Sequence, residues 1–213
     1  MTTGGGGPGA AQSPREILPG LHHWKAVHPR IEIEVGCHYL ASSRIAFDPL
    51  LPVEGVEWFE RHGGVDAVIL SNRHHLRHAE RLAERYGCPI RCHQAGLHEF
   101  SDGPTVEGFG FGERLTEDVV ALEMDAICPD DTVLRLETGP GALLFADALI
   151  SYGGLGFVPD ELIGDDPEAV KRQVRERALE LAQEPIDCLL FAHGDPVLSG
   201  AKDALRQLGR TPS

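Results

Sequence analysis

Apolar and polar residues follow two different spacings along the chain, and the spacings alternate in a regular order. Short segments in which apolar residues alternate with polar ones, or run on continuously between turn residues, are typical of strands. Segments in which they recur every three or four positions are typical of amphipathic helices. The strands predicted in this way are IEIEVGCHYL (31–40), SSRIAFDPLLP (42–52), VDAVILS (65–71), CPIRCH (88–93), VVALEMD (119–125), DTVLRLET (131–138), ALLFADALI (142–150) and IDCLLFAHGDP (186–196). The predicted helices are VEGVEWFERHGG (53–64), LRHAERLAERYG (76–87), PEAVKRQVRERALELAQE (167–184) and SGAKDALRQLG (199–209).

The order of these elements indicates the fold. The first half reads strand, strand, helix, strand, helix, strand, and the second half reads strands, a long helix, a strand and a helix. Two such halves packed sheet against sheet, with their helices outside, make a four-layer αββα sandwich of two mixed β-sheets, an α/β fold. The sequence Gly139-Pro140-Gly141 indicates a hairpin, and the glycine-rich segment 107–118 reads as a turn-like connection between the halves.

The length of 213 residues suits one compact domain with a core that needs no disulfide or metal to hold it together. Residues 1–14, MTTGGGGPGAAQSP, have almost no side chains to bury. We therefore expect a disordered tail at 1–14 and a single domain at 15–213.

Charge and cysteine content narrow the partners and the compartment. The formal charge of -14 and the isoelectric point near 5.1 argue against nucleic acid, whose phosphates this net charge would repel. No apolar run approaches the ~20 residues that a membrane-spanning helix needs, so we expect no membrane contact. The five cysteines are odd in number and scattered, and no signal peptide is recognised, which favours free thiols in the cytoplasm.

The candidate chemistry lies at the ends of three predicted strands. SNRHHLRHAERL (71–82) places His74, His75 and His78 where a strand ends and a helix begins. Asp147 lies near the end of ALLFADALI, and His193 directly follows CLLFA. Loops at strand ends are the usual place for functional sites. Imidazole and carboxylate are ligands of zinc and iron, so the three segments could converge on one divalent ion.

With these residues in place, the chain resembles the metallo-β-lactamase fold superfamily from Leu18 to Leu208. The resemblance rests on LPGLHHW, IAFDPLLP, the histidine-bearing strand-loop-helix, the later ADAL and the closing HGDP. It implies an αββα sandwich in a superfamily of metal-dependent hydrolases, oxidoreductases and degenerate relatives. Its signature is H-x-H-x-D-H, followed by a loop histidine, an aspartate and a final histidine.

This sequence departs from that signature. With Ser71 in the position of the usual threonine, the ligand positions fall on Asn72, His74, Leu76 and Arg77; shifted by one residue, they fall on Arg73, His75, Arg77 and His78. Cys128 stands near the place of the loop histidine, whereas Asp147 and His193 match. A permanently charged arginine among the ligand positions would repel a second cation, so the resemblance implies a site with at most one metal.

The expected ligands are His74 and His78 together with Asp147 and His193, the last two also being the expected catalytic residues. If helical geometry already holds at residue 74, His74 and His78 share a face and His75 turns toward the core, as packing or as a support for a ligand. Further candidates for supporting the site or binding substrate are Arg73, Arg77, Cys128, Asp48 and His93.

These residues lead to three functional hypotheses. In the first, one zinc or iron ion activates water toward a small ester, thioester, lactone or amide, and an arginine holds an anionic group of the substrate. In the second, the chain is a non-catalytic relative that binds a small anionic metabolite or a partner in the same cleft. In the third, it is a mononuclear iron oxygenase of thiols or persulfides.

Overall fold

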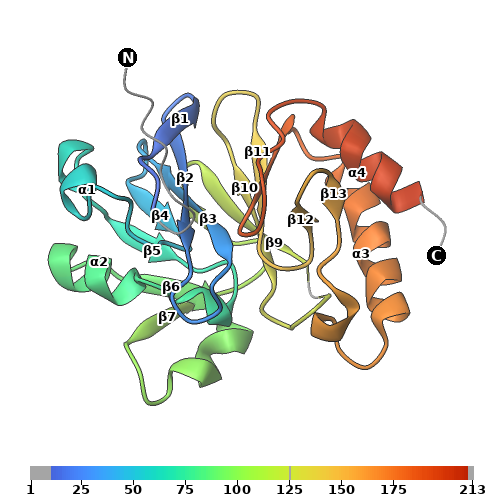
Figure 1. Ribbon diagram of the computed structural model, residues 1–213, viewed down its shortest axis with the longest axis horizontal. Coiled ribbons are helices and arrows are strands. Elements are labelled where there is room, and N and C mark those ends of the chain that lie inside the picture. Colours follow the sequence, from blue (N-terminus) through green and yellow to red (C-terminus); the bar gives the residue numbers. More distant parts are fainter. Residues whose placement is uncertain (1–10, 125, 211–213) are drawn as a thin grey trace.

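Two β-sheets packed face to face form the centre of the molecule. The computed structural model describes residues 11–124 and 126–210, and Figure 1 shows the sheets between two outer layers of helices. The first sheet has the strand order β1-β2-β3-β4-β5-β6-β7. Its strands are β1 (Arg15–Leu18), β2 (Leu21–Val27), β3 (Glu34–Leu40), β4 (Ile45–Phe47), β5 (Ala67–Ile69), β6 (Ile90–His93) and β7 (Val106–Phe109).

The second sheet has the order β14-β11-β10-β9-β8, and a two-stranded ribbon, β12-β13, lies beside it. Its strands are β8 (Arg114–Thr116), β9 (Val119–Glu123), β10 (Thr132–Leu136), β11 (Ala142–Phe145) and β14 (Cys188–Phe191); the ribbon is β12 (Ile150–Ser151) and β13 (Leu155–Gly156). Strands β4 to β7 are parallel to one another, and β11 is parallel to β14. The carboxyl ends of parallel strands meet at one edge of a sheet, which brings loops that are distant in sequence together.

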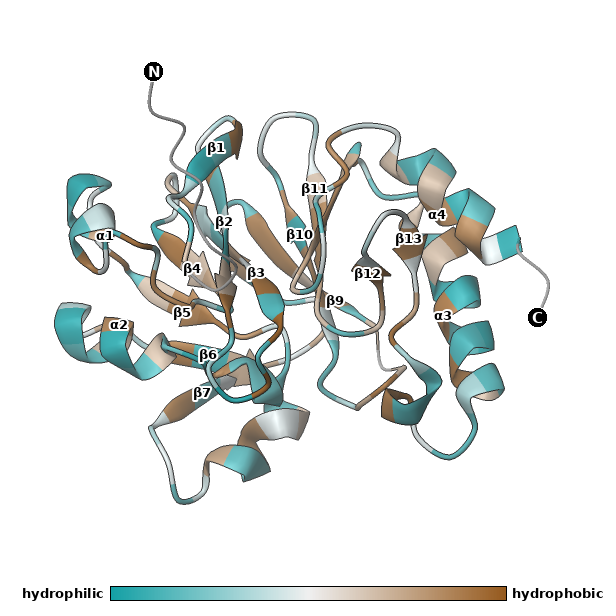
Figure 2. Ribbon diagram, in the orientation of Figure 1, coloured by the Kyte–Doolittle hydropathy of each residue, from teal (hydrophilic) through white to brown (hydrophobic). Residues whose placement is uncertain are grey.

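Helices cover the outer face of each sheet. Figure 2 shows the outward faces of α3 and α4 as mostly hydrophilic. The helices are α1 (Glu57–Arg61), α2 (Ala79–Tyr86), α3 (Pro167–Leu181) and α4 (Ala201–Arg210), with the short 3-10 helices η1 (Arg73–His75), η2 (Gln94–Phe100) and η3 (Asp160–Leu162). Among the helices of the described ranges, none combines the length and the apolar character needed to cross a membrane.

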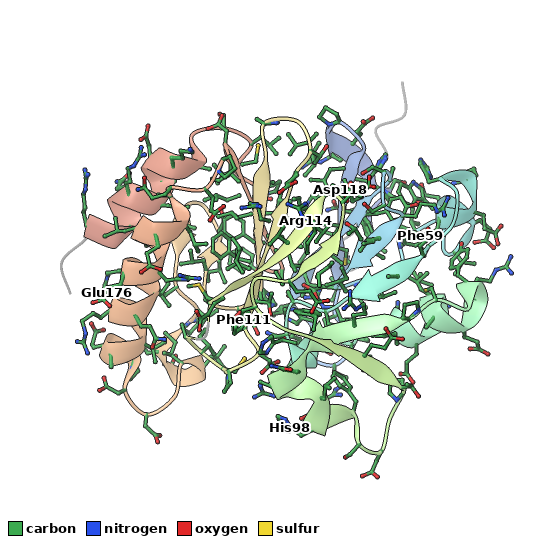
Figure 3. All side chains as sticks on the ribbon, turned by 180° about the vertical axis from the view of Figure 1, so that it is seen from behind. Phe59, His98, Phe111, Arg114, Asp118 and Glu176 are labelled. Carbon is green, nitrogen blue, oxygen red and sulfur yellow. The ribbon has the colours of Figure 1, made fainter. Side chains whose placement is uncertain are left out.

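Three apolar layers hold the sandwich together. Phe59 of α1 packs with Trp24 under the first sheet, and Leu144 lies between the two sheets. The neighbouring Phe145 faces α3 on the other side. Every residue of β11 and β14 is buried, which explains why both strands read as continuous apolar runs. In Figure 3, Glu176 on α3 points to solvent, whereas Phe59 lies among the packed side chains.

The predicted αββα sandwich of two mixed sheets is confirmed, and the hairpin at 139–141 joins β10 to β11. The turn-like connection expected at 107–118 is shorter than predicted: residues 110–113 link the two sheets, whereas β7 ends at Phe109 and β8 occupies Arg114–Thr116. Glycines are common in turns, but Gly108 lies inside β7. A Cβ added to Gly108 would come within 3.0 Å of the side chain of Leu97 on η2, which covers this strand. A glycine in a strand often marks such a close approach.

The predicted tail lies mostly outside the described residues. Of its described part, Gln12 donates its backbone N–H to the carbonyl of Lys25 at 2.8 Å and accepts one from Val53 at 3.3 Å. Residues 11–14 are therefore placed along the edge of the domain rather than projecting from it.

Candidate metal centre

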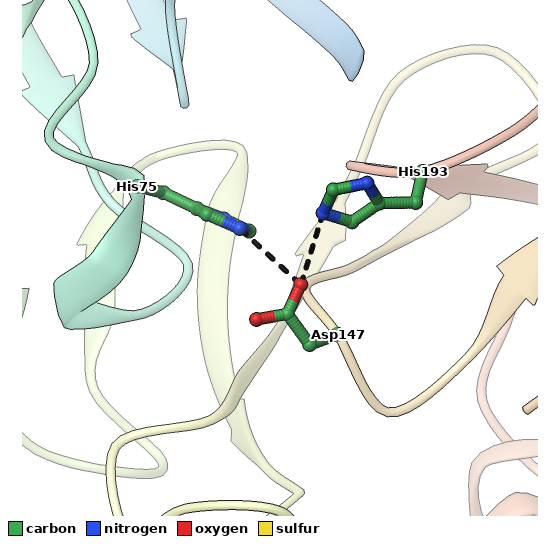
Figure 4. A group of neighbouring side chains, drawn as sticks. All are labelled: His75, Asp147 and His193. Atoms are coloured by element: carbon green, nitrogen blue, oxygen red, sulfur yellow. Dashed lines mark ion pairs between the residues drawn. The ribbon is translucent and has the colours of Figure 1, made fainter. Parts of the chain in front are cut away.

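Three side chains meet at the carboxyl ends of strands from both sheets (Figure 4). His75 ends η1, just after β5, while Asp147 follows β11 and His193 follows β14. Asp147 Oδ1 lies 3.3 Å from His75 Nε2 and 3.1 Å from His193 Nε2. One potential ligand atom from each residue lies within 4.8 Å of the other two. The group therefore brings two imidazole nitrogens and one carboxylate oxygen to a common point.

The turn after β5 is built by Asn72. This buried residue has extended backbone angles, φ -153° and ψ 170°, and its side-chain oxygen accepts the backbone N–H of His74 at 3.0 Å. Side chains of this kind stabilise helix starts by satisfying backbone N–H groups that have no helical partner. The amide nitrogen of Asn72 donates to Asp147 Oδ2 at 2.6 Å. Asn72 thus fixes both the loop that carries His75 and the carboxylate that faces it.

Asp48 and Ser71 hold the other side of the His75 ring. Asp48 Oδ2 lies 3.2 Å from His75 Nδ1, and the Ser71 hydroxyl lies 3.0 Å from the same nitrogen. Asp48 also accepts the backbone N–H of Ser71 at 2.8 Å. A carboxylate behind a histidine in this way fixes the ring and its tautomer. The Nε2 atom of His75 is consequently the one directed at Asp147.

The charges of the three residues depend on one another. Burial lowers the pKa of His75, but the carboxylates of Asp147 and Asp48 more than offset it and raise this pKa to about 9. Burial raises the pKa of Asp147, yet His75 and His193 bring it well below its usual range. Burial lowers the pKa of His193 against the opposing effect of Asp147. At neutral pH the free site therefore holds an imidazolium, a carboxylate and a neutral imidazole.

Arg77 supports this site from outside the group of His75, Asp147 and His193. Its backbone lies in the left-handed region at φ 42°, and its Nη1 donates to the carbonyl oxygens of Gly36 at 2.9 Å and Asp48 at 2.7 Å. Its Nη2 is buried and has no hydrogen-bond partner in the part of the chain that the structure describes. The contacts of Asp147 with His75 and His193 are direct, so no guanidinium separates the three side chains.

His74 and His78, two of the expected ligands, lie outside the group. His74 is exposed, and His78 Nδ1 accepts the backbone N–H of Leu51 at 3.0 Å. The expectation that they share a helical face is wrong, because residues 73–75 form a 3-10 turn and the α-helix starts only at Ala79. The buried His75, expected to be packing or support, is the histidine of this loop that joins the group.

Arg73 and Cys128 belong to a neighbouring cluster. The backbone N–H of Arg73 donates to Asp130 Oδ2 at 2.7 Å, and its guanidinium pairs with the same buried carboxylate. Cys128 takes part in this cluster through Arg73 and Asp130, and burial raises the pKa of its thiol. The two residues therefore border the site rather than join the His75, Asp147 and His193 group.

His93 also lies outside the group. Its ring stacks on Phe111 with centroids 3.8 Å apart, and its Nδ1 accepts the backbone N–H of Ala95 at 3.3 Å. His93 thus starts η2 and packs against the segment after β7.

The supporting roles of Asn72, Ser71 and Asp131 did not follow from the sequence patterns. In the signature comparison Asn72 stands only where a ligand histidine is missing, although an Asn directly after the predicted strand 65–71 is a usual start signal for a helix. Asp131 is buried, and burial raises its pKa well above the usual range, against the opposing effect of a hydrogen bond from the backbone of Asp147. The charge of Asp147 acts in the same direction as burial, which places a neutral carboxyl group close behind the site.

Comparisons with known proteins identify the architecture. No protein-family model matches the sequence, and no curated protein matches it. The solved structure of the metallo-β-lactamase FIM-1 from Pseudomonas aeruginosa, in its mono-zinc form, is 12% identical with a TM-score of 0.70, over 95% of this chain and 96% of that chain.

Two other solved structures are similar over most of this chain. A metallo-β-lactamase family protein from Thermus thermophilus is 16% identical with a TM-score of 0.64, over 91% of this chain and 79% of that chain. A mutant of a flavo di-iron protein from Thermotoga maritima is 17% identical with a TM-score of 0.62, over 92% of this chain and 60% of that chain. At these identities the likeness establishes the fold, and the chain has the metallo-β-lactamase fold.

Proposed function

We propose that this chain is a hydrolase that depends on a single divalent metal ion, zinc or iron, and that cleaves a small acyl-type substrate. The observation that carries the proposal is the meeting of His75, Asp147 and His193 at three strand ends. The substrate class is an ester, thioester, lactone or amide. Hydrolysis adds water across the acyl bond, with its oxygen going to the carbonyl carbon and a proton to the leaving group.

The residues present fit such an ion. Each of the three residues directs one potential ligand atom at the common point. In His75 and Asp147 a neighbouring residue holds the other polar atom of the side chain. His75 Nδ1 is held by Asp48, and Asp147 Oδ2 is held by Asn72. The donor set of two imidazoles and one carboxylate is one that zinc and non-haem iron both take. Because Asn72 holds Asp147 Oδ2, this carboxylate has one oxygen left for an ion, which favours a single-metal site.

The chain's own residues define where substrate would approach. The side chain of His75 is 6% exposed, whereas those of His193 and Asp147 are 12% and 25% exposed, so the open side of the site lies at His193 and Asp147. An ion bound there would polarise the substrate carbonyl and lower the pKa of a water at an open coordination position to about 7. Asn72 and Asp48 would keep the ligands oriented while substrate binds and product leaves.

Arg77 is the residue that we assign to an anionic group of the substrate. Arg73 is already paired with Asp130, whereas Arg77 Nη2 has no partner among the residues described. A guanidinium can bind a carboxylate or phosphate through two parallel hydrogen bonds. Because Nη2 is buried, the side chains that cover it must move when an anion binds.

A second candidate function has its own supporting observation. Asp147 already pairs with the charged His75 and accepts a hydrogen bond from the neutral His193, so the group is stable as a purely structural network. In that case the chain is a non-catalytic relative in which Arg77 binds a small anionic metabolite.

Metal analysis of the purified protein separates these functions. We expect close to one equivalent of zinc or iron per chain, with loss of the metal in His193→Ala and retention in the matched control His78→Ala. Wild-type protein that stays metal-free after reconstitution would favour the non-catalytic function. Bound iron together with oxygen consumption in the presence of thiols or persulfides would identify an oxygenase and contradict the hydrolase proposal. A panel of chromogenic esters, thioesters and lactones tests hydrolysis directly.

A further inference from the structure

A hydrogen bond joins the two sheets next to the candidate metal centre. Gly36 belongs to β3 of the first sheet, and its backbone N–H donates at 2.8 Å to the carbonyl of Ala192, directly after β14 of the second sheet. Ala192 immediately precedes His193. The position of the His193 backbone relative to the first sheet is therefore set at Gly36.

Only a glycine leaves room for this contact. A Cβ built on Gly36 would lie 2.3 Å from the carbonyl oxygen of Phe191. Real Cβ atoms essentially never come closer than 3.0 Å to such an atom. The obstacle is backbone, which cannot rotate away as a side chain can. Gly36 does not have a positive φ, so the need for glycine comes from the close approach of the two strands rather than from backbone strain.

The backbone carbonyl of Gly36 is connected, through Arg77 and Asp48, to the His75 side of the site. Its carbonyl accepts Arg77 Nη1 at 2.9 Å, and the same nitrogen donates to the carbonyl of Asp48 at 2.7 Å. The carboxylate of Asp48 holds the ring of His75. One residue thus connects the loop that carries His75 with the segment that carries His193.

Two further contacts fasten the segment after His193. The carbonyl of His193 accepts the backbone N–H of Ser151 at 3.0 Å. Asp195 forms an ion pair at 2.7 Å with Lys25, which lies on β2, the neighbour of β3. The segment from 192 to 195 is therefore held against the β12 strand at Ser151, and against the first sheet at Gly36 and Lys25.

We propose that Gly36 is a positioning residue that sets the distance of His193 from His75 and Asp147. This inference rests on the proposed metal site. Adding a Cβ would push the Phe191–Ala192 backbone and β3 apart, and metal-ligand distances tolerate changes of only about 0.2 Å. We expect a loss of metal affinity in the range of about 10- to 100-fold, as for other residues that orient ligands.

The test compares Gly36→Ala with Gly141→Ala. A Cβ on Gly141 would meet the carbonyl oxygen of Pro185 at the same 2.3 Å, but at the opposite end of β11 from Asp147. The readouts are Co²⁺ affinity by chelator competition, the visible spectrum of bound Co²⁺, and the ¹⁵N signals of the His193 ring in metal-free protein. We expect Gly36→Ala to bind Co²⁺ at least tenfold more weakly with a shifted His193 signal, and Gly141→Ala to stay within twofold of wild type with an unshifted signal.

Wild-type Co²⁺ affinity and an unshifted His193 signal in Gly36→Ala would overturn the inference, as would equal losses in both variants. If Gly36→Ala does not fold, Asp195→Asn takes its place, with Asp203→Asn as control because Asp203 pairs with Arg206 on α4, at the far face of the second sheet. A His193 shift confined to Asp195→Asn supports the inference, and identical spectra for these two variants overturn it. If wild type binds no Co²⁺, the proposed metal-dependent function fails, and the His193 ring signals in metal-free protein still decide the role of Gly36.

Discussion

A buried histidine pair should make the protein lose stability in mild acid. His23 on β2 and His38 on β3 are each 1% exposed, and His23 Nδ1 lies 3.1 Å from His38 Nε2. The other ring nitrogen of each residue is buried without a hydrogen-bond partner among the described residues. Burial lowers the pKa of His23 to about 4, aided by the nearby Arg15 and Lys25. In the unfolded chain the same ring takes up a proton at the ordinary histidine pKa of about 6.5.

The pKa values of His23 in the folded and unfolded states determine the direction and the size of the change in stability with pH. Because the pKa of His23 is lower in the folded state, the unfolded state binds more protons as the pH falls below about 6.5, so acid favours unfolding. Between pH 7 and pH 5 this linkage removes about 2 kcal/mol of stability through His23 alone. Burial and the charge of His23 lower the pKa of His38 as well, so His38 acts in the same direction.

The assay is urea unfolding of wild type and His23→Gln at pH 7 and pH 5. Glutamine can hydrogen-bond His38 but cannot take up a proton, so the variant should lose about 2 kcal/mol less than wild type over this interval. The difference between the two proteins removes the contribution of the other titrating groups. Parallel stability curves would show that His23 is not held neutral in the core, which would refute the reasoning.

Three further predictions concern the site and the core. His75→Ala should abolish metal binding in elemental analysis while His74→Ala retains it, and the reverse result would restore the exposed histidine as the ligand. Asp48→Asn should weaken Co²⁺ binding about tenfold by loosening the ring of His75, whereas Asp66→Asn, in an exposed ion pair with Arg44, should not; equal affinities would remove Asp48 from the support of the site. Phe191→Ala should lower the free energy of unfolding by about 3–5 kcal/mol in urea titrations, because its ring is fully enclosed and stacked on Phe145; a loss under about 1 kcal/mol would contradict the packing.

The fold could be predicted from the sequence because strands that are buried on both faces appear as continuous apolar runs. The runs around β11 and β14 are continuous and apolar, and the rule that sites form at strand ends then singled out Asp147 and His193. The structure brings both residues into one group.

The choice among the loop histidines depended on geometry that periodicity does not contain. The choice of His74 and His78 as ligands depends on helical geometry from residue 74, but Asn72 starts a 3-10 turn and Arg77 adopts a left-handed conformation before α2 begins. Those two residues decide that His75 turns inward and His74 outward. The amide contact from Asn72 to Asp147 spans 75 positions of the sequence and both sheets, so no local pattern could show it.

The most direct test is a crystal of zinc-reconstituted protein with data collected at the zinc absorption edge. We predict one anomalous peak per chain, within bonding distance of His75 Nε2, Asp147 Oδ1 and His193 Nε2. A peak beside Arg73 and Cys128, a second peak of similar height, or no peak at these three atoms would contradict a single-ion centre built from these residues.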